Sequence, residues 1–177
     1  MSKPKIGAVT IGQSPRPDLI EPLGQLRPDV EIIEVGALDG LTAADLPDAA
    51  EASYPLKTRL RDGHLVTVPE AFLKPLIQQA VEAAEAQQVL ATVLLCAGTF
   101  AEVSGVSRPL VKPFDTAVAV LNSMGVTHIG VLAPMVTQER PIRARWTAAG
   151  FDARVWTPPY AIDSKEFTGW LYRMMSN

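Results

Sequence analysis

The chain has 177 residues, of which 47% are hydrophobic and 20% charged, a balance typical of a globular protein with one domain or two small lobes. Its net charge of −3 comes from interspersed acids and bases, so nothing indicates a nucleic-acid surface. The single cysteine excludes an intrachain disulfide and fits a reducing, cytoplasmic location. The first apolar run is soon broken by polar residues, and no run reaches membrane-spanning length. We therefore expect neither a signal peptide nor a membrane partner.

Strand-like and helix-like patterns alternate through the first part of the chain. Residues 42–45 (TAAD) resemble a capping box with Asp in the usual Glu place. The pair Asp62-Gly63 separates two short apolar segments, which predicts a β-hairpin. In chain order, we expect a strand at 5–11, a helix at 17–26 with Ser14 or Asp18 near its start, a strand at 30–35, and hairpin segments at 54–60 and 64–68.

The clearest helix is expected at residues 69–88, where apolar residues follow helical spacing. Pro75 lies inside it and predicts a kink or a late start. The later elements are a buried strand at 89–95, a helix at 113–124, a buried strand at 127–132, a helix at 136–149 and a strand at 151–156. Buried strands that alternate with crossover helices predict an α/β fold with a doubly wound, mostly parallel sheet.

In such sheets, ligands bind beyond the carboxyl ends of the strands. The first such end is followed by Gly12, Gln13, Ser14 and Arg16, a strand-to-helix turn. Backbone N–H groups at a helix start favour an anion, and an Arg side chain can bind a carboxylate or phosphate through two hydrogen bonds. The pattern is neither a P-loop nor a dinucleotide fingerprint. A small-anion site and a merely capped helix both remain open.

A second turn, residues 94–100, has the same layout and holds Cys96, Gly98 and Thr99. Nearby N–H groups in such a turn favour a thiolate, which can act as a nucleophile or a proton-transfer base. The alternative role is a small apolar residue that ends a buried strand, and the residues alone favour it.

Other candidates carry less information. Pro134 follows a third strand end, and Gln138 opens the next helix, where capping is the simplest role. Arg59 belongs either to a solvated turn or to a cleft. His64 and His128 lie far apart, and we expect structural or exposed roles for both and no metal site.

Six segments together resemble the AroM family, from about residue 5 to about residue 162. The resemblance implies a fold like that of the aspartate/glutamate racemase superfamily, with two similar lobes at 1–108 and 109–177 and a ligand cleft between them. The matching segments are 10–16 (TIGQSPR), 35–41 (VGALDGL), 58–63 (TRLRDG), 95–100 (LCAGTF), 130–134 (GVLAP) with Gln138, and 156–160 (WTPPY).

Racemases of that superfamily need no cofactor and use two cysteines on opposite faces of a carbon acid. By resemblance, Cys96 matches the first cysteine, and the Gln13-Ser14 turn matches the region that holds the substrate carboxylate. This chain has no second cysteine, so two-thiol racemisation cannot operate within it. Its residues after Tyr160 do not match the family pattern, and we expect a second lobe that is incomplete, with a truncated C-terminus.

Three functional hypotheses follow. The first is a protein that binds a small carboxylate- or phosphate-bearing metabolite, without a cofactor or metal and with self-association left open. The second is a cofactor-independent isomerase that uses Cys96 as proton-transfer base, and the third is an incomplete, non-functional product. The binding residues expected are Gly12, Gln13, Ser14, Arg16, Arg59, Gly98, Thr99, Pro134 and Gln138.

Overall fold

The computed structural model describes residues 2–158 and 167–170. The chain forms two compact units, residues 1–119 and 120–177. The lobe boundary expected between residues 108 and 109 stays a prediction. No helix within the described ranges is long and apolar enough to cross a membrane.

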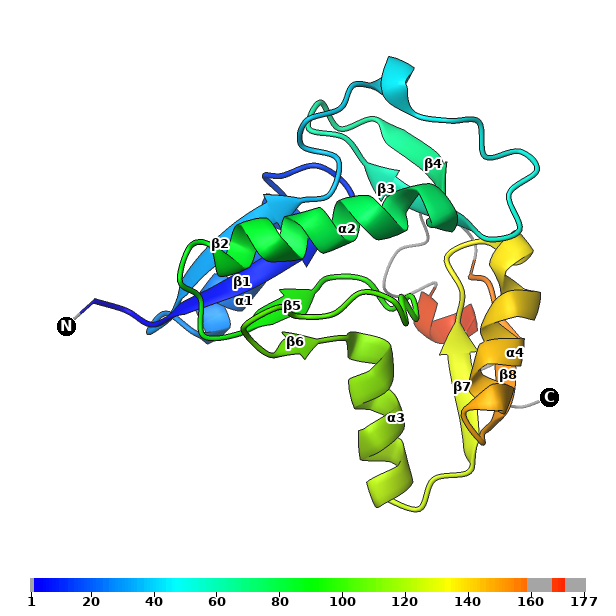
Figure 1. Ribbon diagram of the computed structural model, residues 1–177. Coiled ribbons are helices and arrows are strands. Elements are labelled where there is room, and N and C mark those ends of the chain that lie inside the picture. Colours follow the sequence, from blue (N-terminus) through cyan, green and yellow to red (C-terminus); the bar gives the residue numbers. More distant parts are fainter. Residues whose placement is uncertain (1, 159–166, 171–177) are drawn as a thin grey trace. The chain divides into compact units, whose positions relative to one another are not determined.

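A four-stranded parallel sheet forms the centre of the first unit (Figure 1), with the strands in the order β2-β1-β5-β6. Ala8 on the central strand lies beside Glu34 on one neighbour and Val93 on the other. The predicted α/β fold with a mostly parallel sheet is confirmed. The strand β6 was not expected, because two residues carry no alternation pattern. The strands are β1 (Lys5–Thr10), β2 (Glu31–Gly36), β5 (Thr92–Leu94) and β6 (Leu110–Val111).

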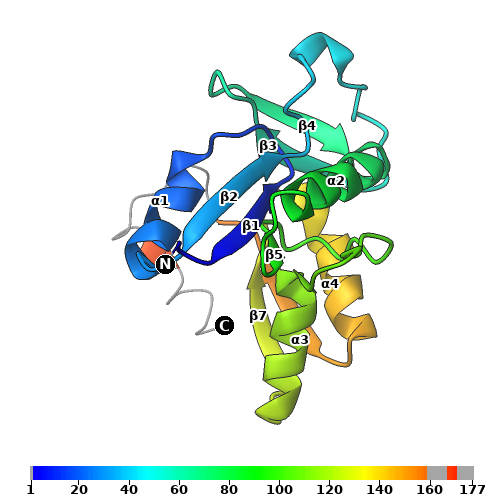
Figure 2. The ribbon, with the colours of Figure 1, turned by 60° about the vertical axis from the view of Figure 1, so that its left-hand side comes forward.

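Two helices, α1 (Pro17–Leu26) and α2 (Glu70–Glu85), lie on opposite faces of this sheet, as Figure 2 shows. Helix α1 begins with a proline at its first position, where the missing N–H costs nothing. None of its residues is fully buried. Helix α2 continues through Pro75 and buries one face against the sheet, where Leu73, Ile77 and Val81 are inaccessible to solvent. The main apolar core therefore lies between α2 and the sheet.

The predicted hairpin is present as β3 (Pro55–Arg59) and β4 (Leu65–Pro69). Its turn closes with a 2.8 Å hydrogen bond from Leu60 N–H to His64 O. Gly63 has φ +90°, a conformation that disfavours residues with a side chain. The predicted capping box is present at η1 (Ala43–Asp45), where the Asp45 carboxylate accepts hydrogen bonds from Thr42 N–H and Oγ1–H.

The second unit contains a two-stranded parallel sheet, β7 (His128–Leu132) and β8 (Asp152–Trp156). Helix α4 (Glu139–Ala148) packs on β8 and buries Ile142 and Trp146. Further helices are η2 (Val136–Gln138) and α3 (Pro113–Ser123), which crosses from the first unit into the second, and residues 167–170 are also helical.

The strand expected at residues 127–132 is present as β7, but the expectation that it is buried is wrong. Exposed and half-buried residues alternate along β7, and Leu132 is 42% exposed. The reason is that β8 is the only strand that pairs with β7 within residues 2–158 and 167–170. Most of the predicted departure after Tyr160 falls outside the described residues.

Candidate functional site

The loop that follows β1 is fixed against the hairpin. A Cβ atom at Gly12 would lie 2.5 Å from the carbonyl oxygen of Arg59, so only glycine allows this approach. Gln13 N–H donates to the same oxygen at 3.1 Å. The sequence therefore places a glycine where the backbones of the loop and the hairpin meet.

Gln13 joins this loop to two other segments. Its side chain is buried, and Nε2 donates to the carbonyl oxygens of Leu38 at 2.9 Å and Leu41 at 2.6 Å. Its Oε1 accepts a 2.7 Å hydrogen bond from Arg61 N–H. Both amide atoms are thus engaged inside the protein, which gives Gln13 a structural role. Its predicted contact with a ligand stays a prediction.

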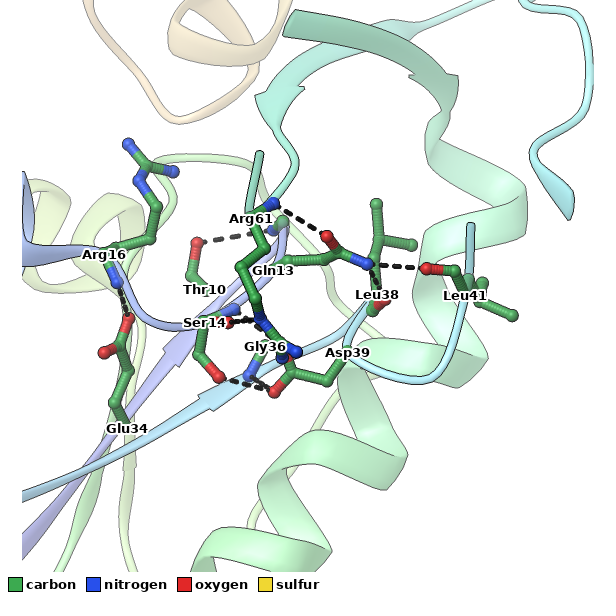
Figure 3. A network of polar contacts seen from close by, with 11 residues as sticks. Thr10, Gln13, Ser14, Arg16, Glu34, Gly36, Leu38, Asp39, Leu41 and Arg61 are labelled. Carbon is green, nitrogen blue, oxygen red and sulfur yellow. Dashed lines mark hydrogen bonds and ion pairs between the residues drawn. The ribbon is translucent and has the colours of Figure 1, made fainter. Parts of the chain in front are cut away.

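The Asp39 carboxylate is the centre of a polar network (Figure 3). Oδ1 accepts a hydrogen bond from Ser14 N–H at 2.7 Å, and Oδ2 accepts from Ser14 Oγ–H at 2.7 Å and Gly36 N–H at 2.8 Å. Arg61 Nη2 lies 3.5 Å from Oδ1. A Cβ atom at Gly36 would lie 2.6 Å from both Asp39 Oδ1 and Ser14 N, so the network depends on a glycine there.

Sequence reasoning did not single out Asp39 as a functional residue. The one signal was its place in the segment VGALDGL at residues 35–41, which matched the AroM pattern as a whole. The contact joins residues 25 positions apart, and no local spacing rule indicates it.

Arg16 is surrounded by the chain's own carboxylates. Its N–H donates to Glu34 Oε1 at 2.7 Å, and its guanidinium donates to both oxygens of Asp18 at 2.8 and 2.7 Å. The hydrogen bond from Arg16 lowers the pKa of the Asp18 carboxyl and raises the pKa of Arg16 itself. Burial raises the pKa of Glu34. The predicted contact of Arg16 with a carboxylate through two hydrogen bonds is therefore present, but the carboxylate belongs to Asp18.

Of the two roles left open for this turn, a side-chain helix cap is absent. Helix α1 has Arg16 at its N-cap position, and its side chain makes no capping hydrogen bond to a backbone N–H, while Asp18 lies in the first turn as expected. The Ser14 hydroxyl instead donates to Asp39. Pro17 has no N–H, while the N–H groups of Ser14 and Arg16 are taken by Asp39 and Glu34. Two of the backbone donors near the helix start, those of Ser14 and Arg16, thus already bind internal carboxylates.

Two arginines of the hairpin keep guanidinium N–H groups at the surface. Arg59 Nη1 lies 3.8 Å from Asp18 Oδ2, and its side chain is 45% exposed. Arg61 Nε donates to Ser14 O at 2.7 Å, and its side chain is 59% exposed. Beside Arg61 is an open pocket of about 510 Å³, whose lining includes Gln13, Asp39, Leu41, Thr42, Arg61 and Asp62.

Cys96 lies at the same edge of the sheet. Leu95 N–H donates to Val9 O at 2.7 Å, so Cys96 follows the carboxyl end of β5 directly beside β1. The cysteine is half-buried and packs against the apolar core of the unit. Gly98 is buried against the ring of Phe100, and Thr99 is half-buried. The structure therefore brings Cys96, Gly98 and Thr99 to the edge that carries Gly12–Arg16.

The other predicted residues lie elsewhere. Pro134 and Gln138 belong to the second unit, where the Gln138 side chain is buried at the end of η2. His64 Nδ1 lies 2.9 Å from Asp62 Oδ2 on the exposed hairpin turn, and His128 Nε2 lies 3.6 Å from Asp152 Oδ2. Within the described part of the chain, no group of three or more His, Cys, Asp or Glu residues could hold a metal ion.

The parallel sheet, the helices on its two faces and the polar turns at its carboxyl edge define an α/β protein of the racemase-like type. The family model described as AroM protein matches residues 6–169, and the chain belongs to the AroM family. The family assignment made from the sequence is thereby confirmed. A comparison with curated proteins gave no match.

Proposed function

We propose that this protein binds a small metabolite with a carboxylate or phosphate group at the carboxyl edge of β1, β2 and β5, and that Arg59 is the main anchor. The observation that carries the proposal is the exposure and weak pairing of Arg59. Its side chain is 45% exposed, and the 3.8 Å contact of its Nη1 with Asp18 Oδ2 is its only ion pair within the described residues.

The ion pair between Arg59 and Asp18 is weak enough for a ligand anion to replace Asp18 as the partner of Arg59. Asp18 already accepts two short hydrogen bonds from Arg16, while the contact with Arg59 is longer than a hydrogen bond. Exposed ion pairs of this kind contribute between zero and about 1 kcal/mol. The planar guanidinium can therefore turn to a ligand and form two parallel hydrogen bonds with a carboxylate or phosphate.

The surroundings of Arg59 support the same class of ligand. Arg61 lies two residues further along the hairpin and borders the pocket of about 510 Å³, a volume suited to a small metabolite. Arg16 holds the loop in place and is proposed to act through it. The predicted position of the site in a cleft between two lobes, the cytoplasmic location and any self-association stay predictions.

The test is a melting-temperature screen with a panel of small carboxylates and phosphates. A ligand that binds only the folded protein raises the melting temperature in proportion to the logarithm of its concentration. We expect Arg59→Gln to abolish that rise. The matched control is Arg27→Gln, which removes another exposed arginine that pairs with an aspartate, and it should leave the rise intact. The proposal fails if no ligand stabilises the protein, or if Arg59→Gln responds as the wild type does.

A second candidate function is proton transfer by Cys96. It is favoured by the half-buried position of this thiol at the sheet edge that carries the proposed anion site. With one thiol, Cys96 can remove an α-proton from a carbon acid and return a solvent-derived hydron to the same face. We therefore expect deuterium incorporation from heavy water without inversion of the carbon. Nuclear magnetic resonance of the substrate checks this, and Cys96→Ala should abolish the exchange.

A further inference from the structure

We infer that the cradle formed by Ser14 and Gly36 is an anion-binding site whose resting occupant is the protein's own Asp39, and that a ligand carboxylate binds there by displacing the Asp39 side chain. Three donors define this cradle: Ser14 N–H, Ser14 Oγ–H and Gly36 N–H. The inference rests on the proposed function for the identity of the displacing ligand. The cradle itself can be tested without that ligand.

The donors are fixed before any anion arrives. The loop around Ser14 is held by the three hydrogen bonds of the Gln13 side chain and by the close contact of Gly12 with the hairpin. Gly36 ends β2, which is paired with β1 along its whole length. Donors that are held in position in this way bind an anion without a further cost of ordering.

All three donors point to a single carboxylate, and its two oxygens are both used at 2.7–2.8 Å. These distances are typical of hydrogen bonds to an ionised acceptor. If Asp39 left without a replacement, two backbone N–H groups and a hydroxyl would lose their acceptor, which disfavours simple opening. A second carboxylate in the same place removes this penalty, while water solvates the displaced Asp39 carboxylate.

The route for exchange is present on the same face. The Asp39 side chain is 31% exposed and lines the pocket of about 510 Å³ together with Arg61. Arg61 Nη2 lies 3.5 Å from Asp39 Oδ1, so the same guanidinium can pair with an anion that replaces Asp39. A ligand that enters this pocket thus meets Arg61 first and the cradle next, while Asp39 turns into water.

The consequence is a built-in competition. Asp39 keeps the cradle closed to weak anions. Its release removes one set of contacts from the turn at residues 36–41, which stays bound to Gln13 through the carbonyl oxygens of Leu38 and Leu41. Binding at the cradle is therefore coupled to the position of that turn.

The experiment is chemical rescue of Asp39→Ala by formate. The substitution removes one carboxylate group, and formate has the size of the group removed. We expect the melting temperature of the variant to fall, and formate to restore most of the loss where chloride at equal ionic strength does not. The amide resonances of Ser14 and Gly36 should move upfield in the variant and return toward their wild-type positions as formate is added.

Two controls sharpen the result. Asp45→Ala also removes a carboxylate that accepts two hydrogen bonds, but from an exposed turn, so formate should give it no rescue beyond that of chloride. The wild-type protein should likewise show no formate-specific shift. If Asp39→Ala does not fold alone, folding in formate but not in chloride supports the inference, and failure to fold in formate overturns it.

The inference is overturned if formate and chloride act alike on the melting temperature and on the two amide resonances. That outcome leaves the proposed function standing, because the metabolite screen depends on Arg59 in the wild-type protein. Conversely, formate rescue together with a metabolite screen that finds no ligand would end the proposed function and leave the cradle established.

Discussion

The turns after β1 and β5 have similar sequences but differ in how they are held. Both follow a buried strand, contain a glycine and a hydroxyl residue, and lie side by side at one edge of the sheet. The first is held by polar contacts with Asp39, Glu34 and the hairpin. The second is held by apolar packing around Phe100, with Cys96 against the core. A strand-to-turn pattern thus indicates where a site lies, while distant partners decide which side chains remain accessible to a ligand.

The largest expected effect comes from Gly36→Ala. Its Cβ atom would lie 2.6 Å from Asp39 Oδ1 and from Ser14 N, so the network must open. We expect a loss of about 3 kcal/mol in the free energy of unfolding, measured by urea denaturation. The control is Gly40→Ala, where the added Cβ meets nothing within 4 Å, and the loss should stay below about 0.5 kcal/mol. Equal losses in the two variants would refute the role given to the Asp39 network.

Asp39→Asn should have the next largest effect. The carboxamide keeps the size of the side chain but replaces one acceptor oxygen with an NH₂ group that faces a donor. We expect the free energy of unfolding to fall by about 2 kcal/mol, because hydrogen bonds to a charged acceptor are lost. Urea denaturation at neutral pH measures this change. A loss no larger than that of Asp48→Asn, on an exposed loop, would contradict the account.

Cys96→Ala should cost less. The thiol is half-buried and packs against an apolar core, so its removal forfeits a limited apolar contact of about 1 kcal/mol. The comparison variant is Ser14→Ala, which breaks the hydroxyl bond to Asp39 and should cost about as much. Both variants are measured at several ionic strengths, because the Ser14 contact involves a charged carboxylate. A marked dependence on ionic strength in Cys96→Ala would show that the second turn is not held by apolar packing alone.

The smallest effect concerns pH. The pKa of Asp18 is lowered below its ordinary value of 3.8, so its contribution to stability is present above that value and is lost as the pH falls through the folded-state pKa. Because Asp18 is exposed, the effect is about 0.5 kcal/mol or less. The difference in unfolding free energy between wild type and Asp18→Asn should therefore shrink below about pH 4.

For Glu34, the expected pH dependence of the free energy of unfolding has the opposite sign. Burial raises its pKa, so the folded state is favoured when Glu34 is protonated, and this contribution is lost as the pH rises through the folded-state pKa. The free energy of unfolding of Glu34→Gln, relative to that of the wild type, should therefore be higher at neutral pH than at acid pH. Urea denaturation across the acid range measures both variants, and parallel pH profiles would contradict the assignment of the two carboxylates.

Local rules accounted for much of the fold. Pro17 after a polar turn indicated the start of α1, and Asp62-Gly63 indicated the hairpin, because each residue type fixes a backbone conformation without help from distant residues. The two-residue strand β6 carried no such signal, and the exposure of β7 depends on which strands pair with it rather than on its own apolar residues.

The candidate site was predictable only as a location. The turn at Gly12–Arg16 was expected to offer donors to an anion, and it does contain them, but Asp39 and Glu34 occupy them from positions on β2 and its following turn. Whether a donor is occupied depends on contacts between residues far apart in sequence. For the same reason, the side chain of Arg16 is only 14% exposed, whereas that of Arg59, also among the expected binding residues, is 45% exposed.

The central claim is tested most directly by a titration of the ¹⁵N-labelled wild-type protein with the small carboxylate or phosphate that stabilises it most. The account predicts that the Arg59 Nε–H resonance shifts and that the Ser14 and Gly36 amide resonances shift with the same midpoint. Arg27 Nε–H, which donates to Asp29, should not move. Resonances of Arg59, Ser14 and Gly36 that stay in place at saturating ligand, or that move no more than Arg27, would contradict it.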